Sequence, residues 1–370
     1  MNQRLSPLAM LAPLFLGACA SQATAPELSC PIKGAVAVDE LIDKDEKHFA
    51  HLWQITSGGQ NAEGYWNFSG DRLSFQRTAD NPKNGPTFAC DRIFVTNPSG
   101  APPTQISNGR GVTTCAYFLP DGKEVLFAST QQWHADCPPK ADPSKGYIWS
   151  LHPEYDIWIK TLDTGVERRL TDEWGYDAEA TVSPLGDRIV FTSSRSGDIE
   201  LWTCDLQGGD LKQVTHEVGY DGGAYFSHDG KRLVWRRTQF SPEKRAPQEA
   251  DYRELLSQWL VRPTSLELYV SDADGGARKQ ITSLGGANWA PYFFPDDKRI
   301  IFASNYREPR TGKFDLFAVG VDGTNLERIT TYDDFDSFPM FSPDGQFLVF
   351  ASNRGGKVAH ETNLFIAQWK

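Results

Sequence analysis

Six polar side chains occupy what the sequence indicates is one repeated position, seven residues before the turn of a recurring hairpin. They are Glu63, Thr113, Asp177, Asp221, Asn288 and Asp336, and Glu179 follows close behind Asp177. Carboxylates gathered at the mouth of one channel would bind a cation, a sugar or a basic peptide. The alternative is that each side chain hydrogen-bonds backbone N–H groups of its own loop, as Asp and Asn commonly do. Recurrence in nearly every unit favours the second interpretation, since a catalytic site more often breaks the symmetry of a repeat.

The cysteines offer a second kind of chemistry. Five follow residue 20, namely Cys30, Cys90, Cys115, Cys137 and Cys204. An odd number leaves at least one thiol unpaired, and we expect a disulfide between Cys115 and Cys137 or between Cys90 and Cys115. His134 with Cys115 and Cys137 is an alternative zinc set, but its spacing matches no closed zinc motif. We therefore expect no metal site and no cofactor, apart from a cation at the channel mouth.

Aromatic side chains are concentrated in two long insertions. The candidate contact residues are Trp133, His134, Tyr147, Trp149 and Trp259. Such side chains stack on sugars or bind peptides. Equally, they would pack the long loops against the scaffold.

A hairpin that recurs six times must position these residues. Its clearest copy is Phe341-Ser342-Pro343-Asp344-Gly345, followed by an apolar strand over residues 347–352. Pro and Asp suit the early turn positions, and Gly takes the positive φ that closes the turn. Each hairpin precedes a third strand, and most are followed by a fourth that ends in a signature such as Gln213-Val214-Thr215. Four antiparallel strands at a period in the forties predict an all-β, six-bladed propeller over residues 48–370.

The two ends of the repeat region complement one another. The last unit stops after its third strand, at residues 368–370, and the missing signature stands at the other end as Gln54-Ile55-Thr56. We expect this N-terminal strand to complete the last blade, which closes the ring and removes an open sheet edge.

Three insertions fall between the second and third strands of their units, at residues 78–89, 130–154 and 239–263. Loops of this kind share one face of a propeller, and binding surfaces usually form on such loops. The third insertion contains the one expected helix, Gln248 to Leu260, with Tyr252, Leu255, Leu256 and Trp259 at helical spacing. This helix either folds down over the rim or binds a partner.

The N-terminus has the pattern of a signal peptide over residues 1–18, with Arg4 before a short apolar run. It ends in Leu16-Gly17-Ala18-Cys19, which resembles the bacterial lipobox. That resemblance implies cleavage before Cys19 and lipidation of its thiol, and Ala20 at the next position implies the outer membrane. Residues 19–47 are small, polar and charged, so we expect a tether with one short helical turn around residues 39–47. The net charge of −11 argues against nucleic acid as a partner.

The hairpin, the Ser194-Arg195 and Asn353-Arg354 pairs after it, and the fourth-strand signature resemble TolB-like, or PD40, β-propeller repeats from about residue 49 to residue 370. The separate N-terminal α/β domain of the Tol-system protein has no counterpart before Phe49, so the resemblance does not imply a role in Tol–Pal. The propeller, the lipid anchor and the lack of a recognisable catalytic set favour a monomeric, non-catalytic scaffold in the envelope, facing the periplasm, that binds a protein, peptide or other ligand.

An enzyme or carbohydrate-binding module acting on oligosaccharides through the channel mouth is the alternative. Hydrolases joined to such propellers carry a Gly-x-Ser-x-Gly elbow, and the sequence contains none. Pectic oligosaccharide lyases also resemble these repeats and use a metal held by channel histidines. The seven histidines here, at positions 48, 51, 134, 152, 216, 228 and 360, fall at unrelated repeat positions.

Overall fold

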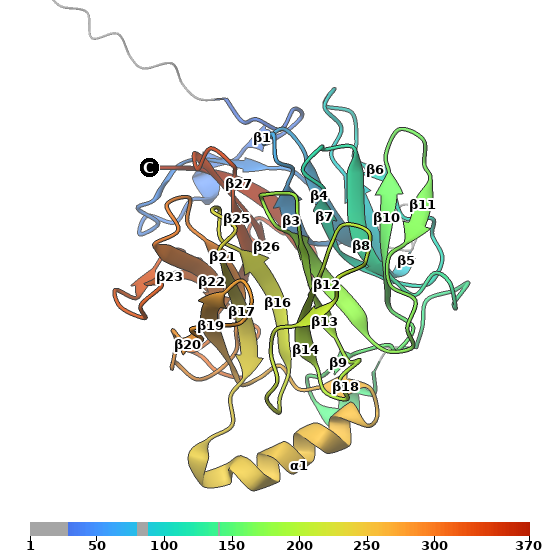
Figure 1. The fold of residues 1–370 in the computed structure, drawn as a ribbon. Helices are drawn as coiled ribbons and strands as arrows, with labels where there is room; N and C mark the ends of the chain where they lie inside the picture. The colour runs from blue at the N-terminus through green and yellow to red at the C-terminus, as the bar shows by residue number, and fades with distance from the viewer. Residues whose placement is uncertain (1–28, 80–87, 140) are drawn as a thin grey trace, which may run out of the picture.

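The computed structural model describes residues 29–79, 88–139 and 141–370. The expected signal peptide, Cys19, the first part of the tether and most of the first insertion lie outside these ranges. The described chain folds into six antiparallel sheets that follow one another around a central axis (Figure 1). This arrangement confirms the predicted six-bladed propeller.

The blades take their strands almost in chain order. Blades one to three are β3 (Gln60–Trp66), β4 (Leu73–Ala79), β5 (Phe88–Val95) and β6 (Thr104–Gln105); β7 (Thr113–Phe118), β8 (Glu124–Ser129), β10 (Asp156–Thr161) and β11 (Glu167–Arg169); and β12 (Asp177–Val182), β13 (Ile189–Ser193), β14 (Glu200–Cys204) and β15 (Lys212–Gln213). Blades four and five are β16 (Asp221–Phe226), β17 (Arg232–Thr238), β19 (Leu266–Asp272) and β20 (Lys279–Gln280); and β21 (Asn288–Phe293), β22 (Arg299–Ser304), β23 (Asp315–Gly320) and β24 (Glu327–Arg328).

Blade six is completed from the N-terminus, as predicted. It contains β25 (Asp336–Phe341), β26 (Phe347–Ser352) and β27 (Asn363–Trp369), and β2 (Phe49–Gln54) pairs with β27 in the fourth position. Figure 1 shows the red C-terminal strand beside the blue N-terminal segment. A further short strand, β1 (Val36–Ala37), pairs with the outer side of β2. The ring is therefore closed by pairing of two distant parts of the chain.

The residues just before β2 are folded onto the propeller, although their composition suggested a tether up to residue 47. A short 3₁₀ helix, η1, spans Asp39–Leu41. Glu46 accepts hydrogen bonds from the Arg354 guanidinium at 2.9 and 3.0 Å, and Arg354 also binds Asp336. All three side chains are buried, so this segment is tied to blade six by a charge cluster.

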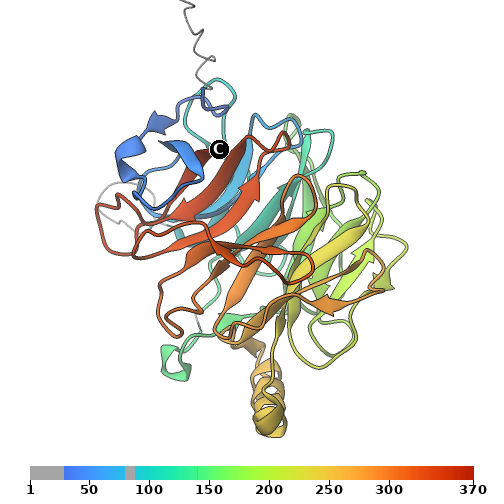
Figure 2. The same cartoon turned by 90° about the vertical axis from the view of Figure 1, so that its left-hand side faces the viewer.

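The second and third insertions meet on one face. β9 (Trp149–Ser150) and β18 (Leu260–Val261) pair to form a small two-stranded sheet. η2 (Pro143–Lys145) precedes β9, and η3 (Pro242–Lys244) leads directly into the helix of the third insertion. The helix α1 spans Arg245–Leu256 and projects from the body of the propeller (Figure 2). It begins three residues earlier and ends four residues earlier than expected, because the chain turns after Leu256 and Trp259 adopts a φ of 57°.

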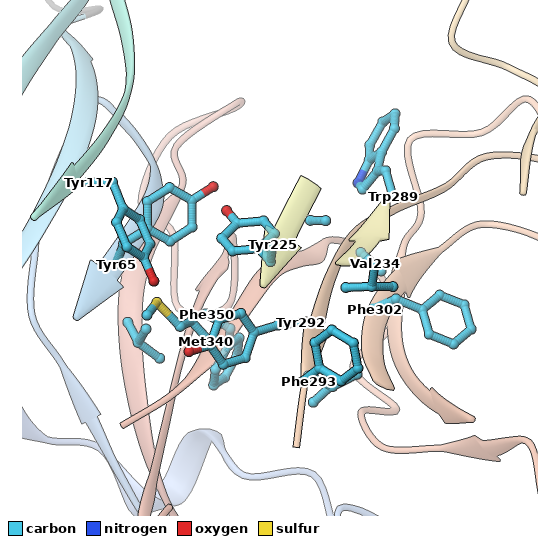
Figure 3. Packing of buried hydrophobic residues seen from close by; sticks show 14 of the residues in the cluster. Tyr65, Tyr117, Tyr225, Val234, Trp289, Tyr292, Phe293, Phe302, Met340 and Phe350 are labelled. Atoms are coloured by element: carbon cyan, nitrogen blue, oxygen red, sulfur yellow. The ribbon is translucent and has the colours of Figure 1, made fainter. Parts of the chain in front are cut away.

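The centre of the propeller is filled by tyrosines from the innermost strands (Figure 3). Tyr65 of blade one packs against Tyr117 of blade two at 5.9 Å between ring centroids, and against Tyr225 of the opposite blade at 5.8 Å. Tyr292 of blade five packs on Tyr225 at 5.5 Å. These buried rings cross the axis and separate the insertion-bearing end of the channel from the opposite end.

Candidate functional site

A cavity of about 1650 Å³ opens above this tyrosine layer, on the face that carries the insertions. Tyr65 and Tyr225 lie at its base, and Trp149 of the second insertion and Trp289 of β21 are among its aromatic walls. Trp289 stacks on Phe314 at 4.3 Å, and Trp149 packs against Trp289 at 5.6 Å. The cavity therefore has a rigid wall built from several blades and one insertion.

A β-bulge in every innermost strand aims one side-chain position into the cavity. The register shifts at the same point in all six strands, and the bulged residue takes a positive φ of 48–60°. These residues, all of which line the cavity, are Glu63, Cys115, Glu179, Gly223, Ala290 and Phe338. Bulges re-aim side chains in this way next to functional sites.

Glu63 was assigned to the wrong repeat position by the sequence. Asn61 pairs with Arg77 in blade one as Asp177 pairs with Ser193 in blade three, so Asn61 is the counterpart of Asp177. Glu63 is the counterpart of Glu179, two positions further along. The error arose because the first hairpin lacks the proline that marks four of the others, and its turn at Asn67–Asp71 was aligned two residues out of register.

The remaining members of the predicted ring lie behind the cavity wall rather than on it. Asp177 accepts a hydrogen bond from Arg195 at 2.8 Å, and Asp221 accepts one from the Trp235 indole at 2.7 Å. Asn288 donates to the Leu266 carbonyl at 2.8 Å, and Asp336 binds Arg354. Burial raises the pKa of Asp221 to about 7. All four are buried. Asp177, Asp221 and Asp336 bind groups of their own blades, whereas Asn288 joins blade five to β19 of blade four.

Glu179 is fully engaged by a network from blades three and four. Its carboxylate forms an ion pair with Arg236 and accepts hydrogen bonds from the Tyr220 hydroxyl at 2.6 Å, Thr192 at 2.8 Å and the Gly223 backbone N–H at 3.0 Å. A Cβ at Gly223 would overlap the Arg236 guanidinium. Glycine at this bulge therefore lets Arg236 reach Glu179, a role that the sequence alone did not indicate.

Arg236 is itself held between aromatic rings. Its guanidinium carbon lies 5.2 Å from the centre of the Trp149 ring and 5.5 Å from that of Tyr220. A buried cation between two rings gains cation–π attraction in addition to its ion pair. Trp149, which the sequence marked as a rim contact, thus orders the cavity wall.

Glu63 has a much poorer set of partners. The Cys115 thiol hydrogen-bonds its carboxyl group, but its Oε2 atom is inaccessible to solvent and has no hydrogen-bond partner among the described residues. Burial, with the neighbouring charges of Glu179 and Asp91, raises the pKa of Glu63 to about 7. Burial also raises the pKa of the Cys115 thiol well above its usual value. The cavity base thus presents one carboxyl group that is only partly satisfied.

The disulfide differs from both expected pairings. Cys90 at the start of β5 is bonded to Cys137 in the second insertion, with Cα atoms 5.8 Å apart, and Cys115 is free. The bulge in β7 turns Cys115 toward the channel axis, whereas the insertion folds back over blade one. Within residues 29–79, 88–139 and 141–370, no three His, Cys, Asp or Glu side chains are grouped so that they could hold a metal ion.

The predicted rim residues divide into exposed and packed side chains. Trp133 is 54% exposed and forms an edge-to-face pair with Trp174, which is 60% exposed and which the sequence did not single out. Tyr147 is 57% exposed and accepts a hydrogen bond from the Trp149 indole at 3.1 Å. His134 lies 3.7 Å from Glu154. Trp259 is partly buried against the core.

In the part of the chain that the structure describes, no helix is long and apolar enough to cross a membrane.

The comparisons with known proteins agree with the fold. Residues 260–360 match the family model PD40, the TolB beta propeller domain. The TolB structure from Acinetobacter baumannii has a TM-score of 0.52 and 17% identity, over 81% of this chain and 64% of that one. The structure of a protein described as a putative TolB from Agrobacterium tumefaciens has a TM-score of 0.53 and 15% identity, over 84% of this chain and 91% of that one. An oligogalacturonate lyase in complex with manganese has a TM-score of 0.52 and 13% identity, over 91% of this chain and 96% of that one.

This chain therefore spans less than two thirds of the A. baumannii protein. None of the curated protein sequences compared with it matches. At these identities the solved structures bear on the fold alone, and they include both TolB proteins and an enzyme. Residues 260–360 thus match PD40, and the chain as a whole is a six-bladed β-propeller whose fold is similar to that of the TolB structures.

Proposed function

We propose that the protein is a non-catalytic binding propeller that is anchored by lipid in the bacterial envelope. Its protein or peptide partner docks on the insertion-bearing face, over the cavity. The observation that carries this proposal is the coincidence of three features on one face: the cavity, the paired insertions and the exposed rings of Trp133, Trp174 and Tyr147. Aromatic side chains around a concave centre are typical of binding surfaces.

Site-specific photo-crosslinking in living cells tests the docking face. A photoreactive amino acid replaces Trp133 or Tyr147 on the proposed face, and Lys123 or Thr324 in exposed turns on the opposite face serves as the control. We expect discrete crosslinked bands from the first pair and none from the second. The same band from all four positions, or bands from the control pair only, would contradict the assignment of the face.

Lipid anchoring at Cys19 rests on the lipobox-like sequence and is tested separately. Cys19→Ser should release the protein from the outer-membrane fraction into the soluble periplasmic fraction, because a lipidated cysteine supplies the stable membrane attachment. Metabolic labelling with a fatty-acid analogue should mark the wild-type chain and spare the variant. An unlabelled wild-type chain would refute the anchor and leave the docking face to its own test.

Oligosaccharide binding or cleavage is the alternative, and the aromatic walls of the cavity favour it most, since such rings stack on sugars. Incubation of the purified protein with galacturonate oligomers and manganese distinguishes the two functions. Our proposal predicts no ultraviolet-absorbing unsaturated product and no binding of the oligomers by calorimetry. Stoichiometric binding or turnover would favour the alternative.

A further inference from the structure

We propose that the Glu63 carboxylate, at the base of the cavity, recognises a single lysine ammonium group that the partner inserts into the channel. This inference rests on the proposed binding function and names the chemical group that the cavity takes. It follows from the geometry of Glu63, from the charges around it and from the shape of the space above it.

In the described part of the chain Glu63 forms no ion pair of its own, and the nearby Arg236 guanidinium is paired with Glu179. Glu179 is neutralised by Arg236 and receives three further hydrogen bonds. Asp91 accepts hydrogen bonds from Thr78 and Gln76. Glu63 has the Cys115 thiol, a weak donor, and one oxygen without a partner. A buried carboxylate with so few donors is costly, so a ligand that donates to the carboxyl group from the cavity offsets part of that cost.

The sum of the charges around Glu63 favours a cation. The ionisable groups that face it are the carboxyls of Glu179 on β12 and Asp91 on β5, the Arg236 guanidinium on β17, the Cys115 thiol on β7, and the phenols of Tyr65, Tyr155 and Tyr225. The thiol and the phenols are neutral near pH 7, since burial raises the pKa of each one. Arg236 is paired with Glu179, so the guanidinium that acts on Glu63 is shared with a second carboxyl group.

The geometry selects an ammonium group over a guanidinium. A guanidinium gains most from a carboxylate that offers both oxygens to its fork, whereas an ammonium is a compact point charge. At Glu63 the Oε2 atom is inaccessible to solvent, so a ligand in the cavity cannot contact both oxygens. One donor at one oxygen is the arrangement that a lysine supplies.

The cavity also accommodates the lysine stem. The charged groups Glu63, Glu179 and Arg236 come from blades one, three and four, whereas Ala290 and Phe338 of blades five and six make the facing bulge positions apolar. Trp289 and Phe314 extend this apolar side. A lysine stem packs along such a wall while its charged end contacts a polar group, and nearby rings add cation–π attraction.

Binding should depend on pH in one direction. The pKa of Glu63 is raised to about 7, and the cation binds the ionised form. The ionised fraction rises roughly tenfold between pH 6 and pH 8, so the affinity should rise by about the same factor. His152 also lines the cavity, but burial lowers the pKa of its imidazole, so its neutral form predominates across this range.

The test uses the full chain, solubilised in detergent, and two probes that differ by one charge. They are Nα-acetyl-lysine methylamide and its Nε-acetylated counterpart, titrated by ligand-observed NMR. We expect the charged probe to bind with the pH dependence above, and the neutral one to bind at least about tenfold more weakly. Equal binding of both probes, or no binding of the charged probe at millimolar concentration, would overturn the proposal.

Two variants localise the effect. Glu63→Gln keeps the shape of the side chain and should weaken the charged probe at least about tenfold, with loss of the pH dependence. Asp334→Asn removes an equal charge from an exposed position on the same cavity and should change the affinity less than twofold. Equal effects would show that the probe senses only the overall field. If Glu63→Gln failed to fold, the two probes and the wild-type pH profile would still decide.

Failure of this inference is distinguishable from failure of the proposed function. If crosslinking at Trp133 and Tyr147 persists unchanged in Glu63→Gln while the lysine probe does not bind the wild-type protein, the docking face stands and the lysine assignment is wrong. If crosslinking is absent from this face altogether, the proposed function falls as well.

Discussion

Replacement of Arg236 by methionine is the sharpest test of how the cavity is held together. Arg236 and Glu179 have side chains that are each only 10% exposed, and they form one ion pair within the network of Tyr220 and Gly223. Removing one partner of a buried pair leaves an uncompensated buried charge, which typically costs about 3–5 kcal/mol. Methionine preserves much of the volume between Trp149 and Tyr220, so most of the loss should be electrostatic.

The number of protons bound by the folded and unfolded states determines how the stability of Arg236→Met changes with pH. In Arg236→Met, Glu179 and Glu63 would face each other without a cation, and the folded variant would bind more protons than its unfolded chain near neutral pH. Its stability should therefore fall as the pH rises, so the deficit against wild type is largest at pH 8 and smallest near pH 5. The double variant Glu179→Gln with Arg236→Met removes the buried charge and should recover much of the loss.

Guanidinium unfolding followed by tryptophan fluorescence at pH 5, 6.5 and 8 measures these differences. Lys212→Met is the matched control, because Lys212 and its partner Asp210 are 62% and 54% exposed and such a pair contributes about 1 kcal/mol or less. A deficit in Arg236→Met that is the same at all three pH values, or no larger than that of Lys212→Met, would refute the electrostatic account of the network.

Three further outcomes are expected. Glu63→Gln should become more stable than wild type as the pH rises from 4.5 to above 7, by up to about 3 kcal/mol. The reason is that the folded-state pKa of Glu63 is raised from 4.5 to about 7, so ionisation of Glu63 opposes folding in the wild-type protein. A difference in unfolding free energy that does not change with pH would contradict this. Cys90→Ser with Cys137→Ser opens a loop across a sequence separation of 47 and should cost about 4 kcal/mol in the chain-entropy account, measured as a lower denaturant midpoint against the wild-type protein. Deletion of β2, residues 49–54, exposes the edge of β27 and should give aggregated protein on size-exclusion chromatography, so a folded monomer would argue against closure by this strand.

The fold could be predicted from the sequence because the residues of the hairpin turns are recognisable. Turns such as Ser342-Pro343-Asp344-Gly345 specify their own geometry, and the Asp344 carboxylate accepts hydrogen bonds from Ser342 and Gln346 within that turn. Closure was equally readable, since Gln54-Ile55-Thr56 repeats the fourth-strand signature and the Thr56 hydroxyl accepts the Leu364 N–H as Thr215 accepts that of Leu201. Each of these contacts lies within one blade, so a repeated local pattern was enough to predict it.

The disulfide could not be predicted in the same way. Its bond depends on the path of a long insertion from blade two back over blade one, and that path is fixed by tertiary contacts such as the pairing of Trp149 with Val261. The short sequence separations favoured a bond to Cys115. The side chain of Cys115 points toward the channel because of a β-bulge. This bulge cannot be recognised from residue type, because its position holds Glu, Cys, Gly, Ala and Phe in different blades. Neither constraint is local.

The repeated polar residues were easier to recognise in the sequence than the bulged residues, but they say less about function. Asp177, Asp221, Asn288 and Asp336 recur because each one makes buried hydrogen bonds that hold its blade in place, so their similarity reflects structure. The bulged residues face a shared cavity, where six identical side chains would give a symmetric channel with no preferred side. Their divergence makes one side charged and the other apolar. A ligand with a cationic end and an apolar stem can enter such a cavity in only one orientation, so in this propeller specificity is expected where the repeats differ.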